Sequence, residues 1–183
     1  MRLVLLGPPG CGKGTQAKEL VKNLGLTYIG TGEILRDAIA RGTPTGEAAK
    51  PLIDQGMLVP DHVVNDLVAE LLRGPNRPER FVTDGYPRTY AQAVSFDALL
   101  RAEYLELTAV INLTISDDEV MKRMLARKRA DDNEGTIRQR LKEFHQNNDA
   151  LVDFYARRGL LKTVPAVGAV GDIYANILLA LGV

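Results

Sequence analysis

Residues 7–15 of the chain read GPPGCGKGT, which places four glycines and one lysine within nine positions. Glycines allow successive backbone N–H groups to turn toward one point and form a concave site for an anion. A helix predicted to begin at Lys13 would direct the partial positive charge of its N-terminus at the same point. The spacing of Gly7, Gly12 and Lys13 after a short apolar strand therefore predicts a P-loop, in which Lys13 serves the outer phosphates of a ligand. The alternative is a glycine-rich turn with a surface lysine.

The residue after the lysine departs from the common P-loop pattern. Position 14 holds glycine, where many P-loop enzymes have the serine or threonine that binds Mg²⁺. Mg²⁺ would then be held mainly by phosphates, by water and by a distant carboxylate. Asp84 is the candidate, because it ends an apolar strand at the sheet edge where ligands bind, and its alternative role is that of a turn residue before Gly85. The chain contains no Asn-Lys-x-Asp motif, which argues against a Ras-like GTPase.

Basic side chains concentrate in one part of a chain whose formal net charge is zero. The group comprises Arg127, Lys128, Arg129, Arg138 and Arg140. Arg138 and Arg140 are two positions apart on a predicted helix, so they point about 200° from one another. Arg140 borders the apolar stripe of that helix, whereas Arg138 points away from it. We therefore expect Arg140 to enter a cleft, and a solvated basic face is the alternative for such a group.

The order of the predicted elements is that of a doubly wound sheet. Short apolar runs predict strands buried on both faces, and their alternation with helices indicates an α/β fold of three layers around a central five-stranded parallel sheet. The strands are expected at 3–6, 28–29, 80–84, 109–113 and 160–164. The helices are expected at 13–24, from Thr31 to Ile39, from Glu47 to Gln55 after a break at Gly42, Pro44 and Gly46, from a cap at Asp61 to Leu71, after a capping box at Thr89–Gln92, from a cap at Ser116 to Leu125, from a cap within 131–133 to Tyr155, and from Ile173 to Leu181.

The composition is that of an ordinary globular domain, with 45% hydrophobic and 25% charged residues. Lys and Arg total 23, as do Asp and Glu, so the overall charge gives no reason to expect nucleic-acid binding. No apolar stretch is long enough to span a membrane. Cys11 is the only cysteine, which excludes an internal disulfide and a four-cysteine metal site. We expect a single cytoplasmic domain, in a monomer, with no membrane or nucleic-acid partner.

Five segments of the sequence resemble the adenylate kinase family of nucleoside monophosphate kinases. They run in the family's order and span nearly the whole chain: GPPGCGKGTQ (7–16), TGEILR (31–36), GMLVPD (56–61), DGYPRT (84–89) with Gln92, and RADD (129–132). The resemblance implies the reaction ATP + AMP ⇌ 2 ADP, with ATP, AMP and ADP as partners and Mg²⁺ as cofactor. It also implies one domain over 1–183, made of a core (1–29, 60–125 and 133–183), a small helical AMP-binding lobe (30–59) and a short lid (126–132).

The resemblance assigns roles to individual residues of this chain. Those implied in catalysis are Lys13, Arg88, Arg127, Arg129 and Arg140. Those implied in ATP binding are Gly10, Cys11, Gly12, Lys13, Gly14, Thr15, Arg127 and Gly168. Those implied in AMP binding are Thr31, Arg36, Met57, Leu58, Val59, Gly85, Tyr86, Pro87, Arg88, Gln92, Arg129 and Arg140. Asp84 is implied as the carboxylate that reaches Mg²⁺ through water.

Three local features qualify this assignment. Thr31 and Gln92 would contact the adenine of AMP, although either could simply cap a helix, and Glu33 stands where the family usually has aspartate. Only Lys128 separates Arg127 from Arg129, where long-lid relatives insert a segment that sometimes binds zinc. The lid is therefore expected to be short and to hold no structural zinc.

The chemistry implied needs no general base. The chain has no Ser-His-Asp or Cys-His set, and His62 and His145 stand apart. A phosphate oxygen of AMP is already largely ionised at neutral pH, because its second pKa is near ~6. Catalysis then reduces to alignment and charge neutralisation. The alternatives that the sequence leaves open are a UMP/CMP or broad-acceptor kinase and a non-catalytic adenine nucleotide sensor.

Overall fold

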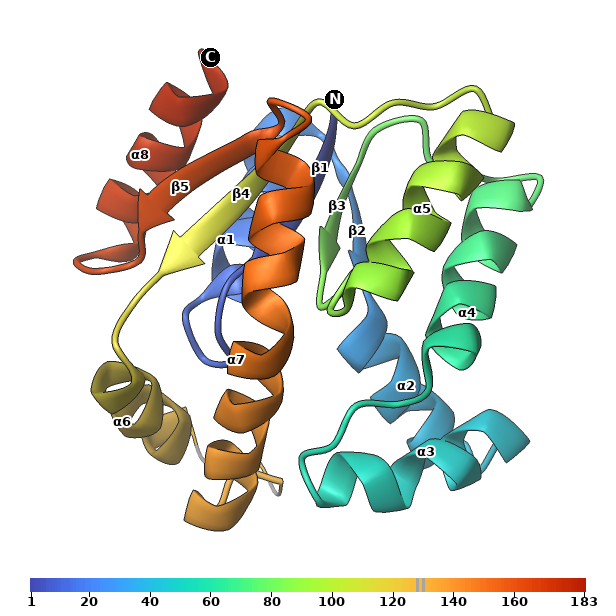
Figure 1. Ribbon diagram of the computed structural model, residues 1–183, viewed down its shortest axis with the longest axis vertical. Coiled ribbons are helices and arrows are strands. Elements are labelled where there is room, and N and C mark those ends of the chain that lie inside the picture. The colour runs from blue at the N-terminus through green and yellow to red at the C-terminus, as the bar shows by residue number, and fades with distance from the viewer. Residues whose placement is uncertain (128, 130) are drawn as a thin grey trace.

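The computed structural model describes residues 1–127, 129 and 131–183, and its centre is a five-stranded parallel sheet (Figure 1). The strands lie in the order β2-β3-β1-β4-β5, which confirms the predicted α/β fold. They are β1 (Arg2–Leu6), β2 (Thr27–Gly30), β3 (Phe81–Asp84), β4 (Ala109–Thr114) and β5 (Leu161–Pro165). The described helices are α1 (Lys13–Leu24), α2 (Thr31–Ala40), α3 (Pro44–Asp54), α4 (Asp61–Arg73), α5 (Tyr90–Ala102), α6 (Asp117–Arg127), α7 (Glu134–Ala156) and α8 (Val170–Leu181). Lys128 and Ala130, which fall in the expected lid, lie outside the described residues.

Helices cover both faces of the sheet. α1 and α8 pack on one face, and α4, α5 and α7 lie over the other. Successive side chains of a strand point to opposite faces. Accordingly Leu3 and Leu5 of β1 join the buried cluster under α1 and α8, while Val4 and Leu6 join the cluster under α4, α5 and α7. Both faces of β1 are therefore buried, which explains why its sequence is apolar at successive positions.

The carboxyl ends of three neighbouring strands meet at one edge of the sheet. Asp84, the last residue of β3, is in register with Leu5 of β1 on one side and with Gly30 of β2 on the other. The glycine loop after β1, the first turn of α2 after β2 and the turn after β3 therefore begin side by side. Ligands of open parallel sheets bind at this kind of edge.

Two helical pairs extend beyond the sheet on either side of this edge (Figure 1). α2 packs against α3 on one side, and α6 packs against the N-terminal half of α7 on the other. The contact between α2 and α3 is close at Gly46, where a Cβ atom would lie 2.3 Å from the carbonyl oxygen of Ala38. Glycine is therefore required at position 46 for the two helices to approach.

The start of α3 differs from the sequence-based prediction. The helix begins at Pro44 rather than Glu47, and the expected break at Pro44 and Gly46 was wrong. Thr43 caps the helix by accepting a hydrogen bond from the backbone N–H of Gly46 at 3.1 Å. Proline is favourable at the first helical position, because it needs no backbone donor there. The two residues that ordinarily end helices thus serve the start of this one.

The start of α4 lies where it was predicted, but the residue at its cap position differs from the prediction. Asp61 is the first residue of the helix, and Pro60 occupies the cap position without a side-chain hydrogen bond. The carboxylate of Asp61 instead accepts hydrogen bonds from Thr89 Oγ1 at 2.9 Å and from Gln92 Nε2 at 2.8 Å. Asp61 therefore ties α4 to the start of α5.

The remaining differences from the predicted bounds are small. Helix α8 begins at Val170, three residues before the expected Ile173, and the ends of the strands differ from the predicted ends by at most one residue.

No helix in the described part of the chain combines the length and the apolar character that crossing a membrane would need.

Candidate functional site

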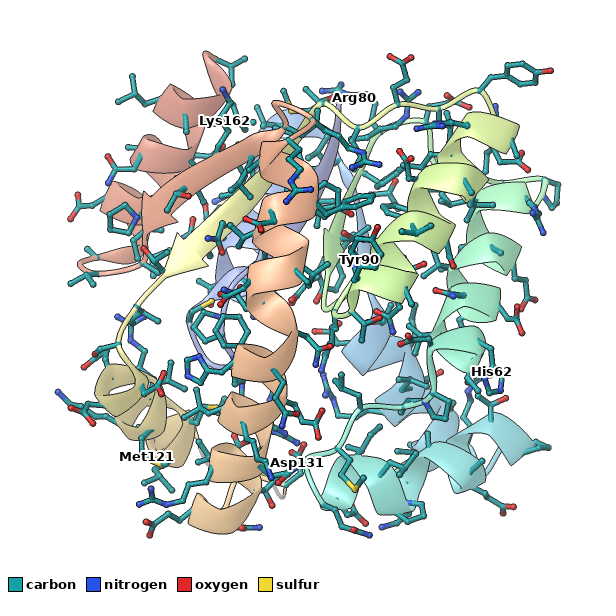
Figure 2. The ribbon with its side chains drawn as sticks, in the orientation of Figure 1. His62, Arg80, Tyr90, Met121, Asp131 and Lys162 are labelled. Atoms are coloured by element: carbon teal, nitrogen blue, oxygen red, sulfur yellow. The ribbon has the colours of Figure 1, made fainter. Side chains whose placement is uncertain are left out.

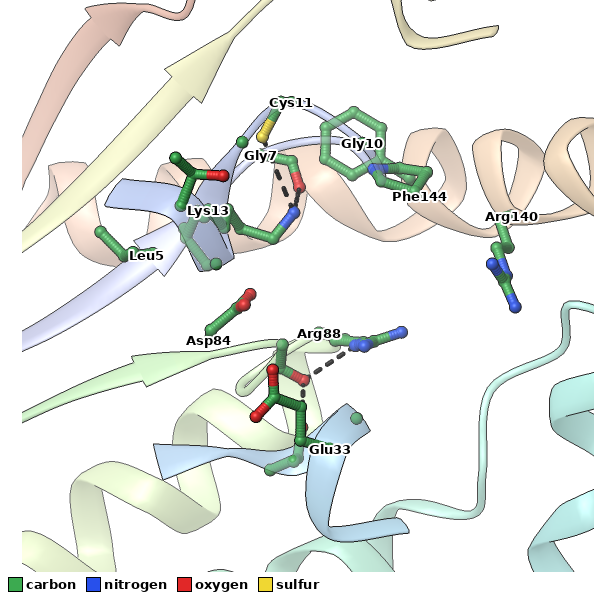
Figure 3. A pocket seen from close by; sticks show the side chains of 18 of the residues that line it. Leu5, Gly7, Gly10, Cys11, Lys13, Glu33, Asp84, Arg88, Arg140 and Phe144 are labelled. Carbon is green, nitrogen blue, oxygen red and sulfur yellow. Dashed lines mark hydrogen bonds between the residues drawn. The ribbon is translucent and has the colours of Figure 1, made fainter. Parts of the chain in front are cut away.

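A cavity of about 690 Å³ opens at the edge where β1, β2 and β3 end. The glycine loop, α2, residues 56–59, the turn after β3, α6, α7 and the loop at Gly168 line it (Figure 3). This volume lies near the middle of the range for small-molecule sites. Every site residue named from the sequence lines the cavity except Tyr86. Tyr86 is buried behind the turn after β3, where its hydroxyl donates to Asn65 Oδ1 at 2.7 Å.

The glycine loop depends on backbone angles that favour glycine. Gly10 and Gly12 have φ angles of +75° and +107°, in the left-handed region. At Gly10, a Cβ atom would also lie 2.5 Å from Met124 Cγ, so both the angle and the space require glycine. At Gly12, the N-cap of α1, the surrounding space is open and the angle alone is the reason. The backbone of the loop thus runs directly into the first turn of α1.

The ammonium group of Lys13 folds back over this loop. Its Nζ donates to the carbonyl oxygens of Gly7 and Pro8, at 2.8 Å each, and lies 3.7 Å from Cys11 Sγ. The side chain is half-buried, and Figure 3 shows it beside Gly7 and Cys11 at the upper wall of the cavity. Backbone atoms within six residues of Lys13 therefore set the position of its charge.

The carboxylate of Asp84 faces the same space from the opposite wall (Figure 3). Its Oδ2 accepts a hydrogen bond from the hydroxyl of Tyr28 at 3.1 Å, and a Cβ atom at Gly14 would lie 3.2 Å from the same oxygen. Burial, and then the charge of Asp84, raise the pKa of Tyr28 above its ordinary value of 10, so the hydroxyl stays protonated and donates. The absence of a side chain at Gly14 leaves the carboxylate room beside α1.

A shared carbonyl oxygen organises the opposite side of the cavity. Gly85 O accepts from Thr31 Oγ1 at 2.9 Å and from Arg88 Nε at 2.8 Å. Gly85 has a φ angle of +79°, and a Cβ atom there would lie 2.8 Å from a guanidinium nitrogen of Arg88. The turn after β3 thus holds Arg88 and Thr31 together, and the hydroxyl of Thr31 retains its acceptor lone pairs.

The side chain of Gln92 is buried, lines the cavity and is hydrogen-bonded to the protein at both its oxygen and its nitrogen. Its Oε1 accepts from the backbone N–H of Arg88 at 2.7 Å, and its Nε2 donates to Asp61. The backbone N–H of Gln92 donates to Thr89 Oγ1 at 3.1 Å, which is half of the predicted capping box. The other half is replaced by the bond to Arg88. Gln92 therefore helps to fix the turn that carries Arg88.

Arg36 and Arg88 form a cationic wall of the cavity. Among the described residues, neither makes an ion pair within 4.0 Å. Burial lowers the pKa of Arg88 most; the charge of Asp84 opposes this effect, and the charges of Arg140 and Arg36 add to it. Burial, then the charge of Arg129, likewise lowers the pKa of Arg36. Arginine stays cationic despite such shifts, so like charges face one another across a space that suits a polyanion.

Two of the remaining arginines are held by neighbouring carboxylates. Asp132 accepts from Arg127 Nε at 2.5 Å and Nη2 at 2.9 Å, and from Arg140 Nη1 at 3.0 Å. Arg140 also pairs with Asp131. Burial raises the pKa of Asp131, but the hydrogen bond and charge of Arg140 outweigh it, so the net pKa is below the ordinary value of 3.8. Arg129 lines the cavity, and its carbonyl oxygen accepts a hydrogen bond from the backbone N–H of Asp132 at 3.0 Å.

The predicted difference between Arg138 and Arg140 is confirmed. The side chain of Arg140 is 17% exposed and lines the cavity, whereas that of Arg138 is 69% exposed and pairs with Glu134 on the outer face of α7. The helical period alone separated the two residues.

Sequence reasoning missed several lining residues, among them Arg123, Phe144 and Tyr28. Arg123 donates to the carbonyl oxygen of Cys11 at 3.4 Å, and its place one helical turn before Arg127 could have revealed it. Phe144 projects from α7 toward the glycine loop, as Figure 3 shows, one turn beyond Arg140. Tyr28 gave no signal beyond its place near the end of a strand, because its partner Asp84 lies 56 residues away.

Other charged side chains of the molecule lie outside the cavity. Figure 2 shows His62, Arg80 and Lys162 at the outside of the molecule. None of these three lines the cavity. The basic residues that do line it therefore form a distinct set within a chain of zero net charge.

The donor set does not form a metal cage. Among residues 1–127, 129 and 131–183, no three His, Cys, Asp or Glu side chains group closely enough to hold an ion. A single carboxylate beside the glycine loop fits Mg²⁺ instead, because Mg²⁺ usually keeps several waters and binds through one or two carboxylates and substrate phosphates.

A parallel sheet with a glycine loop, a lysine at the head of α1 and arginines across the cavity defines a P-loop nucleotide phosphotransferase. The comparisons with known proteins agree. The family model described as "Adenylate kinase" matches residues 5–160. The adenylate kinase of Thermus thermophilus is 43% identical over 99% of this chain and 97% of its own length. The adenylate kinase of Mycolicibacterium smegmatis is 44% identical over 100% and 99%, and that of Deinococcus deserti is 44% identical over 96% and 94%. The chain belongs to the adenylate kinase family.

These matches bear out the resemblance noted from the sequence. They do not favour a pyrimidine-acceptor kinase or a non-catalytic sensor, since all three relatives carry the name of one enzyme.

Proposed function

We propose that this member of the adenylate kinase family catalyses ATP + AMP ⇌ 2 ADP by in-line displacement inside the 690 Å³ cavity. The observation that carries the proposal is the placement of Lys13 at one wall of the cavity and of Arg88 and Arg36 at another. A ligand with several phosphates would neutralise the mutual repulsion of these cations.

The triphosphate donor is assigned to the side of the cavity that α1 and α8 form. Gly10, Cys11, Gly12, Lys13, Gly14 and Thr15 would hold its phosphates, with the N-terminus of α1 adding favourable charge. Gly168, with Val170 and Ile173 at the start of α8, would cover the base. Arg127 and Arg123, one turn apart on α6, close the same side.

AMP is assigned to the side that α2, residues 56–59 and the turn after β3 form. Arg36 and Arg88 would bind its phosphate, since guanidinium groups offer paired donors to phosphate oxygens. Thr31 and the buried Gln92 would border the adenine, against an apolar wall of Met57, Leu58 and Val59. Gly85 and Pro87 line this side, and Tyr86 supports it from behind.

Asp84 is the residue that would hold Mg²⁺, through water. When bound, Mg²⁺ neutralises charge on the transferring phosphates. Asp84 stands opposite Lys13 (Figure 3), where its carboxylate would accept hydrogen bonds from metal-bound water.

Catalysis by the chain's own residues is then positioning and charge neutralisation. Lys13, Arg88, Arg127, Arg129 and Arg140 would surround the transferring group, whose negative charge spreads over its outer oxygens. The attacking oxygen of AMP needs no base, and the cavity must exclude water to prevent hydrolysis. We assign that closure to residues 126–132 as a lid and to residues 30–59 as the AMP-binding lobe, moving on a core of 1–29, 60–125 and 133–183.

We further propose a cytoplasmic monomer that uses Mg²⁺ but no structural zinc and binds neither nucleic acid nor membranes. The balanced composition of 23 basic and 23 acidic residues supports this proposal. Gel filtration at micromolar concentration would test the monomer.

The decisive test is whether the purified chain forms ADP from ATP, AMP and Mg²⁺. We expect ADP to form, and the rate to fall by at least about tenfold when UMP or CMP replaces AMP. Tight nucleotide binding without ADP formation would instead establish a sensor, and equal rates with all three acceptors would establish a broad-acceptor kinase.

A further inference from the structure

The hydroxyl of Tyr28 approaches Asp84 from the edge strand of the sheet. It donates to Asp84 Oδ2 at 3.1 Å, and both residues line the cavity. In the register between β2 and β3, Asp84 is opposite Gly30, so Tyr28 reaches it diagonally from two positions earlier in β2. The contact is therefore built from two strands rather than from one flexible loop.

The ring of Tyr28 is held over Gly30. A Cβ atom at Gly30 would lie 2.5 Å from three atoms of the ring and hydroxyl of Tyr28. The ring also packs against the apolar cluster under α1, to which Leu20 and Leu26 belong. Any larger residue at position 30 would displace the ring, so the sequence Tyr-x-Gly in β2 provides the space that this hydrogen bond needs.

A carboxylate that reaches a metal through water must present one oxygen in a fixed direction. An ionised carboxylate accepts hydrogen bonds at both oxygens and rotates about its terminal torsion when neither is held. Tyr28 holds Oδ2, which leaves Oδ1 for a water molecule in the cavity. Hydrogen bonds to metal-associated carboxylates often change metal affinity or activity by about 10- to 100-fold.

We propose that Tyr28 is a positioning residue, whose hydroxyl orients the Asp84 carboxylate toward the water shell of the nucleotide-bound Mg²⁺. The inference rests on the proposed role of Asp84. It differs from a purely structural role, in which the hydrogen bond would only tie the edge strand β2 to β3 and would affect stability without affecting the metal.

The test compares Tyr28→Phe with Tyr174→Phe. Tyr174 packs against the same apolar cluster but does not line the cavity, and its hydroxyl has no hydrogen-bond partner among the described residues. Tyr174→Phe therefore removes the same hydroxyl group at a site outside the cavity and serves as the matched control. Calorimetry would give the Kd of ATP with excess Mg²⁺ and with EDTA, and assays would give the free Mg²⁺ concentration for half-maximal rate.

We expect Tyr28→Phe to weaken MgATP binding and to raise the half-saturating Mg²⁺ concentration by about 3- to 10-fold, below the usual range because Asp84 reaches the metal only through water. ATP binding in EDTA should stay within twofold of the wild type, and Tyr174→Phe should change neither quantity. A Tyr28→Phe protein that differs from wild type only in melting temperature would overturn the proposal.

Asp84→Asn separates this proposal from the one on which it rests. If Asp84→Asn leaves the Mg²⁺ dependence unchanged, Asp84 does not serve the metal and both proposals fail. If Asp84→Asn changes the dependence but Tyr28→Phe does not, only the role of Tyr28 fails. If Tyr28 acts only through the Asp84 carboxylate, Tyr28→Phe should add less than twofold in the Asp84→Asn background, because coupled residues are not additive.

Discussion

The glycine loop and the arginine cluster at the junction of α6 and α7 hold their charges in opposite ways. Lys13 is held by two neutral carbonyl oxygens of its own loop, within six residues of sequence. Arg127 and Arg140 are held by the anionic side chains of Asp131 and Asp132. The first arrangement leaves a net positive charge in place, whereas the second cancels much of it.

This difference teaches how each region must respond to a nucleotide. Under the proposed function, Lys13 would meet a phosphate with little rearrangement, because no carboxylate competes for it. Arg127 and Arg140 would exchange a carboxylate for a phosphate, which would couple their use to a change in side-chain positions. The glycine loop is thus a prepared site, and the arginine cluster is a site that the ligand completes.

The largest effect should come from removing the prepared charge. Lys13→Met should lower kcat by about 10³-fold, because one preorganised charge at the transferring phosphates is lost. Coupled assays of ADP formation would measure kcat, and circular dichroism would check the fold. Lys22→Met, on the exposed face of α1, is the control and should act within twofold. Near-normal turnover of Lys13→Met would remove the lysine from the mechanism.

The second prediction compares two arginines of one helix. Arg140→Met should lower kcat/KM by about 10²-fold, since the cavity loses a charge that the ligand would recruit. Arg138→Met removes the same charge from the outer face of α7 and should act within twofold. Steady-state kinetics at saturating Mg²⁺ would measure both. Equal losses would mean that overall charge, and not placement in the cavity, decides the rate.

The acceptor side allows a third, smaller test. Thr31→Val keeps the shape of the side chain but removes the hydroxyl that shares Gly85 O with Arg88. We expect the preference for AMP over CMP, as a ratio of kcat/KM values, to fall about tenfold. An unchanged ratio in an acceptor panel would exclude Thr31 from base recognition and leave it a purely structural partner of the turn.

The smallest effect concerns stability in acid. The pKa of Asp131 is lowered in the folded state, so its stabilising contribution is complete above its unfolded value of 3.8 and is lost as pH falls through the lower folded value. Asp131→Asn should therefore melt at a lower temperature than the wild type above about pH 3.8, where the wild-type carboxylate is ionised. Below that pH the difference in melting temperature should shrink by about 2 °C, after allowance for solvent screening. Thermal melts between about pH 2.5 and 6, with the exposed Asp66→Asn as control, would measure it. A constant difference across this range would contradict the assignment.

Local sequence patterns were sufficient for the glycine loop, the five strands and the choice between Arg140 and Arg138. Each depends on residues within about two helical turns of one another, where the strand and helix periods determine which side chains share a face. The starts of α3 and α4 were less predictable. Gly46 is needed inside α3 because the backbone of Ala38 in α2 leaves no room for a side chain there. The carboxylate of Asp61 accepts hydrogen bonds from Thr89 and Gln92 instead of capping its own helix.

The sequence by itself thus determined the order of the elements, the glycine loop and the family of the chain. Only the tertiary structure decided that Tyr28 meets Asp84, that Arg123 meets Cys11 and that Gln92 holds the turn carrying Arg88. The physical reason is the range of the interactions. Backbone angles and periodicity act between near neighbours, whereas these contacts form only where strands and helices distant in sequence end at the same edge of the sheet.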